Sequence, residues 1–137
     1  MNIDEFLKRQ GQQPKQRKKP DDEEHRIQVA CVRWFRLQYP EYADILFAIP
    51  NGGRRDAITG AKLKDEGVIA GVSDLIFLKA NRFYGSLCIE MKKPKGEQSQ
   101  SQKEWQQAVE RAGSKYALCF SLNDFMREVK DYLQYIP

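Results

Sequence analysis

The sequence is poor in the residues from which many enzymes build metal and nucleophilic sites. Its 137 residues include one histidine, His25, and three cysteines, Cys31, Cys88 and Cys119. The cysteines are odd in number, widely separated and without a C-x-x-C pair, which argues against a disulfide framework and a structural zinc site. A single histidine also disfavours chemistry that needs this residue both as a base and as a metal ligand. Any catalysis is therefore expected to depend on carboxylates and lysine.

The chain also lacks a long apolar segment. No apolar run approaches the roughly 20 residues of a membrane helix, and the N-terminus has no apolar signal-peptide core. We therefore expect a protein without membrane contact that is not secreted and stays in the cytoplasm.

Charge is present in both signs but is unevenly distributed. Lys and Arg total 23 against 19 Asp and Glu, and residues 1–20 hold six of the basic and two of the acidic groups. Residues 21–137 therefore carry 17 charges of each sign and are neutral. We interpret residues 1–20 as a basic flexible arm and residues 21–137 as one domain. The arm is consistent with a solvated tail that aids solubility or with a segment that holds nucleic-acid phosphates.

Hydrophobic periodicity and turn residues predict four helices and four strands in residues 21–137. The predicted helices cover residues 21–39, 57–66, 99–112 and 122–135, and the predicted strands cover residues 45–49, 74–78, 86–93 and 116–120. This order, αβ(α)ββαβα, predicts an α/β fold in which a mixed four-stranded sheet is flanked by helices.

Two acidic residues and a lysine are expected to converge on neighbouring strands. Asp74 begins one predicted strand, and Glu90 and Lys92 leave the same face of the next strand because they are two residues apart. Two carboxylates and a backbone carbonyl can hold Mg²⁺, and a nearby lysine can stabilise the charge that develops when a phosphodiester is hydrolysed. A Glu-x-Lys pair alone is also typical of a solvated strand face with a weak ion pair.

Four motifs in this order resemble the signature of the VRR-NUC nucleases, a branch of the PD-(D/E)xK superfamily. They are PNGG at 50–53, GAKLKDEGVIAGVSDL at 60–75, IEMK at 89–92, and Gly96 followed by Ser99 and Gln102. The resemblance covers about residues 23–120 and implies a restriction-endonuclease-like core. It is closest to the stand-alone, minimal members of the family, which are similar to Holliday-junction resolvases.

The resemblance also implies roles for particular residues. Asp74 and Glu90 would be metal ligands, the backbone carbonyl of Met91 a third ligand, and Lys92 the catalytic lysine. The family places a further glutamate on the first helix, and its Glu-x-x-x-Gln spacing matches Glu24 and Gln28. Glu23 is an alternative because it follows a second helical stripe, and either glutamate could simply favour the helix N-terminus. We choose Glu24 as the catalytic and metal-binding residue of this helix.

Gln102 has two interpretations that are compatible with each other. With Ser99 it forms the pattern of a capping box, in which its side chain bonds back to the Ser99 backbone. In the family, this glutamine lies near the active site, so we include it among the catalytic residues.

A basic rim is expected around the acidic site. The segment 50–55 is compatible with an ordinary turn, but it could also hold phosphate with backbone amides and two guanidinium groups. The resemblance supplies nucleic acid as a substrate, and the residues that we assign to DNA binding are Asn51, Gly52, Gly53, Arg54, Arg55, Lys62 and Lys93.

The resemblance therefore implies an Mg²⁺- or Mn²⁺-dependent DNA endonuclease. By analogy with the stand-alone members, we expect a structure-selective homodimer that acts on branched DNA such as four-way junctions, in the cytoplasm of a bacterial or virus-infected cell. The alternatives are a catalytically silent nucleic-acid-binding module on the same fold, and a nuclease for flaps, plain duplex or RNA.

Overall fold

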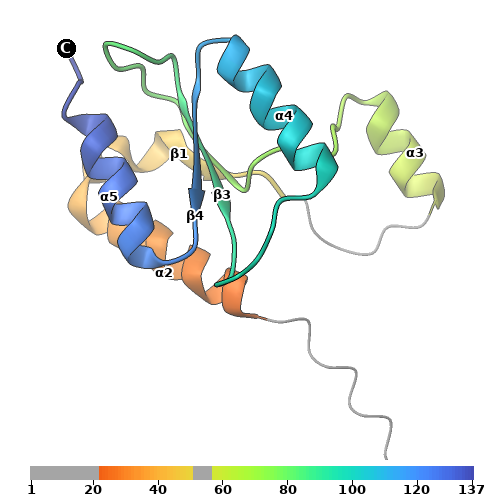
Figure 1. The fold of residues 1–137 in the computed structure, drawn as a ribbon, viewed down its shortest axis with the longest axis horizontal. Helices are drawn as coiled ribbons and strands as arrows, with labels where there is room; N and C mark the ends of the chain where they lie inside the picture. The colour runs from red at the N-terminus through yellow and green to blue at the C-terminus, as the bar shows by residue number, and fades with distance from the viewer. Residues whose placement is uncertain (1–21, 51–56) are drawn as a thin grey trace, which may run out of the picture.

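A computed structural model describes residues 22–50 and 57–137, and it shows a central sheet with helices on both sides (Figure 1). The helices are α2 (Glu23–Gln38), the 3-10 helix η1 (Pro40–Ile45), α3 (Ala57–Asp65), α4 (Gln100–Arg111) and α5 (Leu122–Leu133). The strands are β1 (Leu46–Ala48), β2 (Leu75–Phe77), β3 (Leu87–Met91) and β4 (Lys115–Cys119). No helix in the described ranges has the length and apolar character needed to cross a membrane.

The four strands form one sheet in the order β1-β2-β3-β4. β1 and β2 are antiparallel, β2 and β3 are antiparallel, and β3 and β4 are parallel. The parallel step requires a crossover, which α4 provides between β3 and β4. The predicted mixed four-stranded sheet is therefore confirmed, with the predicted element order.

One face of the sheet packs on α2 and α5 and forms the main core. Phe35 and Cys31 of α2 and Phe125 and Val129 of α5 are fully buried against the sheet. On the opposite face, α4 packs on β4, where the Trp105 ring meets the Tyr116 ring edge-on with centroids 6.2 Å apart, and Gln102 of α4 hydrogen-bonds Glu90 of β3. β3 is consequently buried on both faces along its whole length.

The sequence prediction missed one element, η1. Pro40 is a helix stop when it is considered alone, but here it occupies the first turn of a 3-10 helix, where its missing N–H is not needed. The other element ends differ from the predicted ones by at most two residues, and Gly67 and Gly113 follow α3 and α4 with φ of 103° and 95°. The predicted arm, residues 1–20, lies outside the described residues.

Candidate active site

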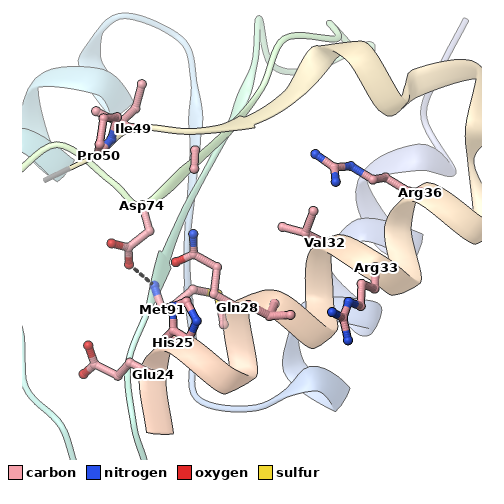
Figure 2. Close-up of a pocket in the computed structure, with 12 residues that line it drawn as sticks. Glu24, His25, Gln28, Val32, Arg33, Arg36, Ile49, Pro50, Asp74 and Met91 are labelled. Atoms are coloured by element: carbon pink, nitrogen blue, oxygen red, sulfur yellow. Dashed lines mark hydrogen bonds between the residues drawn. The ribbon is translucent and has the colours of Figure 1, made fainter. Parts of the chain in front are cut away.

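The sheet register brings Asp74 and Glu90 together. Leu75 pairs with Ile89 in the antiparallel β2–β3 ladder, so one further step along the register places Asp74 opposite Glu90 on the same face. The Asp74 carboxylate accepts a hydrogen bond from the Met91 N–H at 2.7 Å, drawn as a dashed line in Figure 2. The Asp74 carbonyl accepts another from the Ile49 N–H at 2.9 Å, which ties this position to the end of β1. Backbone hydrogen bonds from two neighbouring segments therefore fix Asp74.

Glu90 is a buried carboxyl group with incomplete hydrogen bonding. Only 3% of the residue is exposed. Its Oε1 accepts a hydrogen bond of 2.9 Å from the Gln102 side-chain amide, whereas its Oε2 has no hydrogen-bond partner in the described part of the chain. In the ionised carboxylate a buried acceptor without a partner is costly, so in that state the site has capacity for one more ligand at this oxygen.

The proximity of the carboxyl groups changes their acidity. Burial, followed by the charge of the neighbouring Asp74 carboxylate and a hydrogen bond to it from the protonated Glu90 side chain, raises the pKa of Glu90 to about 9. Burial also raises the pKa of Asp74, although its bond from the Met91 N–H acts in the opposite direction. The Lys92 ammonium lowers the pKa of both groups and Glu24 raises both. At neutral pH without a cation, Glu90 therefore holds a proton that a bound cation would displace.

Gln102 both caps α4 and contacts the acidic pair. Its side-chain oxygen accepts from the Ser99 N–H at 2.8 Å, and its backbone N–H donates to the Ser99 hydroxyl at 3.2 Å, which completes the capping box. Because the capping bond uses the amide oxygen, the NH₂ group of Gln102 is turned toward Glu90. The capping box that the sequence predicts is confirmed, and it orients the same side chain toward the candidate site.

Lys92 is half-buried one residue beyond β3, on the face that carries Glu90. Its backbone N–H donates to the Cys119 carbonyl of β4 at 2.8 Å. A Cβ added at Gly96 would lie 3.4 Å from Cβ and 3.5 Å from Cδ of Lys92, so the loop after β3 follows the lysine stem closely. The ladder and this loop together restrict where the ammonium group can lie.

Glu24 reaches the same end of the sheet from the first turn of α2. Its Oε1 accepts a hydrogen bond of 3.2 Å from the Lys93 N–H, and it lines a cavity with Asp74 and Met91 (Figure 2). Glu23 is not among the residues that line this cavity. The structure thus places Glu24, the residue chosen from the sequence, beside Asp74.

The donor set suits a hard divalent cation. Among the residues that the structure describes, no three carboxylate, imidazole or thiol groups form a complete metal cluster. Asp74 and Glu90 are the two carboxyl groups that lie close together, and the buried Oε2 of Glu90 accepts no hydrogen bond from the described residues. Mg²⁺ is commonly bound by one or two carboxylates and retains several waters, so this pair fits Mg²⁺ or Mn²⁺ better than a metal that needs a full protein cage.

The predicted basic rim is only partly described. Asn51, Gly52, Gly53, Arg54 and Arg55 lie outside the described residues. Lys62 is exposed on α3, and Lys93 is exposed after β3, where its backbone N–H meets Glu24. Of the two rim residues that the structure describes, Lys93 is therefore the one connected directly to the acidic site.

Sequence reasoning missed a cavity of about 500 Å³ between α2 and the end of β1. Besides Glu24 and Asp74, it is lined by polar and cationic side chains of α2: His25, Gln28, Arg33 and Arg36 (Figure 2). The sequence held a signal, because Glu24, Gln28, Val32 and Arg36 recur every four residues on one helical stripe. A second, smaller hollow of about 270 Å³ adjoins Asp74, Glu90 and Gln102, so Asp74 borders both.

Comparisons with known proteins concern the family and the fold of the chain. A family model of the VRR-NUC domain matches residues 22–122. A solved structure described as a VRR_NUC domain protein is similar to the chain with a TM-score of 0.72 and 24% sequence identity, covering 82% of this chain and 89% of the other. At this identity the likeness supports the fold alone. No curated protein matches the chain significantly.

Proposed function

Because the chain belongs to the VRR-NUC nuclease family, we propose that it is a DNA endonuclease that depends on Mg²⁺ or Mn²⁺. The observation that carries the proposal is the close Asp74–Glu90 pair, in which Glu90 is buried and one of its oxygens accepts no hydrogen bond. A structural ion pair would satisfy both carboxylates with cations, whereas this pair instead has an elevated Glu90 pKa and an unused acceptor.

The side chains of this pocket have distinct roles in the proposed reaction. Asp74, Glu90 and the Met91 carbonyl would hold the cation, with Glu24 at its margin. The bound cation would polarise the phosphoryl group and lower the pKa of the attacking water. Water attacks phosphorus in line, and one phosphorus–oxygen bond of the backbone breaks. Lys92 orients the water or stabilises the negative charge that grows on the phosphoryl oxygens, and Gln102 keeps Glu90 in place.

Replacing Lys92 tests the reaction directly. Lys92→Ala is expected to reduce cleavage by about 100-fold or more, because one charged group that acts in the transition state is lost from a partly buried site. Wild type and variant are incubated with a four-way junction, a flap, plain duplex and single strand in Mg²⁺ or Mn²⁺. Lys103→Ala, which removes an exposed lysine of α4, is the matched control and should cut like wild type.

The outcomes of this assay separate the alternatives. Equal rates for Lys92→Ala and wild type would contradict the mechanism. DNA binding without cleavage of any substrate would favour a catalytically silent binding module. Our preferred substrate is branched DNA, and cleavage confined to plain duplex would overturn that choice.

We further propose that the active form is a homodimer, since paired cuts across a junction require two active sites related by a two-fold axis. Sedimentation analysis at assay concentration is expected to give a mass near 32 kDa, twice the 16.0 kDa of one chain. A protein that stays monomeric with or without junction DNA would remove the argument for paired cutting.

A further inference from the structure

The cavity beside α2 has carboxylates at one end and guanidinium groups at the other. Figure 2 shows Asp74 and Glu24 on one side of the view and Arg33 and Arg36 on the other, with Val32 between the arginines and the carboxylates. Arg33 and Arg36 are exposed and three residues apart, so they lie on adjacent turns of one helix face. The cavity thus continues from the acidic site toward two guanidinium groups.

Part of the cavity wall is apolar. Val29 and Val32 of α2 line the cavity together with Ile49 and Pro50, which follow β1, and the polar His25 and Gln28 line it closer to Glu24. A duplex exposes its phosphates but keeps the faces of its bases stacked inside, so these faces cannot contact apolar side chains. An unpaired nucleotide has both an anionic phosphate and an exposed apolar base face, and proteins bind such strands with a cationic groove and an apolar contact for the base.

We propose that this groove, formed by Val29, Val32, Arg33, Arg36, Ile49 and Pro50, binds an unpaired nucleotide of the DNA strand that is cleaved. The base lies against Val32 and Ile49, and its phosphate is held by Arg33 and Arg36. This assignment rests on the proposed function only in taking DNA as the ligand. It supplies a physical basis for choosing branched DNA, because branch points and strand ends provide unpaired nucleotides.

The spacing along α2 separates this phosphate from the reacting one. Arg33 is nine residues beyond Glu24, which corresponds to about 14 Å along the helix axis at 1.5 Å per residue. The guanidinium groups therefore hold a phosphate some nucleotides away from the bond that is cut. They act as substrate-positioning groups, and their removal should weaken binding without altering the Asp74–Glu90 pair.

Binding without metal tests the groove independently of the chemistry. Fluorescence anisotropy in EDTA, at one fixed salt concentration, measures binding to three DNAs. They are a duplex that carries a single-stranded arm, the same DNA with abasic residues in its arm, and a blunt duplex. Arg33→Ala and Arg36→Ala should each lower affinity for the armed duplex about tenfold, since a charge-assisted hydrogen bond contributes about that factor. Affinity for blunt duplex should fall far less. Abasic residues should weaken wild-type binding to the armed DNA.

Arg26→Ala is the matched control, because Arg26 is an exposed arginine of the same helix that does not line the cavity. It should weaken binding to all three DNAs by one small factor. The assignment is overturned if Arg33→Ala and Arg36→Ala behave like Arg26→Ala, or if the abasic arm binds as tightly as the normal arm. A failure of cleavage in Mg²⁺ or Mn²⁺ would overturn the proposed reaction and leave the binding result standing.

Discussion

Glu90→Gln is expected to abolish DNA cleavage and, at the same time, to stabilise the metal-free protein. The amide keeps the size and shape of the side chain but cannot supply the anionic oxygen that the cation requires. Because the carboxylate is one of only two in the close pair, we expect cleavage to fall by at least about a thousandfold. The gain in stability has a separate cause, which is the cost of a buried carboxyl group with an unpartnered oxygen.

The pH dependence gives the sign of this stability effect. The pKa of Glu90 is raised to about 9 in the folded chain, so between pH 4.5 and about 9 the folded state holds a proton that the unfolded state has released. The stability of the metal-free protein should therefore fall as the pH rises through this window. The Glu90→Gln variant has no proton to lose at this position, so its stability should fall less steeply with pH. Its gain in stability over wild type therefore grows with pH, to roughly 1–3 kcal/mol at pH 8.

Thermal unfolding in EDTA at pH 5, 7 and 8 measures the stability of wild type and of Glu90→Gln. Cleavage is assayed separately with Mg²⁺ or Mn²⁺. Glu110→Gln provides the matched control, since Glu110 is exposed on α4. That control should leave cleavage unchanged and shift the melting temperature equally at all three pH values. A Glu90→Gln protein that is less stable than wild type at pH 8 would contradict the cost assigned to the buried Glu90 carboxyl group.

The acidic pair was predictable because it follows from strand alternation and a short connection. Asp74 directly precedes β2 and Glu90 lies on β3, and the antiparallel pairing of Leu75 with Ile89 brings the two carboxyl groups near each other. The orientation of Gln102 was also predictable, because Ser99-x-x-Gln102 predicts the capping box, and the capping box determines which way the side-chain amide faces. These features depend on contacts that are local in sequence or on a single ladder.

The α2 side of the site was harder to predict because it depends on how a helix is rotated against the sheet. Glu23 and Glu24 lie on different helical stripes, and only the packing of Phe35 and Cys31 into the core determines which stripe faces the carboxylates. Arg33 and Arg36 resemble ordinary exposed arginines in the sequence. Their place in a cavity arises from the position of Ile49 and Pro50, which belong to a different element.

Gly71→Ala is expected to be among the most destabilising single substitutions in the loop that leads to Asp74. Gly71 has a φ of 86°, and a Cβ at this position would lie 2.3 Å from the Ser101 carbonyl oxygen and 2.8 Å from the Gln102 nitrogen. Both are backbone atoms of the first turn of α4, so no side-chain rotation relieves the clash. The loop and the helix must move apart, which also pulls Gln102 away from Glu90.

Gly67→Ala separates the two causes of this effect. Gly67 also has a positive φ, 103°, but a Cβ there would have no heavy atom within 4 Å. It should cost only the backbone strain, about 1 kcal/mol, whereas Gly71→Ala should cost about 3 kcal/mol or more and lower the melting temperature by roughly 10 °C. Cleavage by Gly71→Ala, measured well below its melting temperature, should also fall, while Gly67→Ala should retain it. If both variants unfold at the same temperature, the α4 turn is not packed against Gly71, and the support that this contact gives to Gln102 and Glu90 is absent.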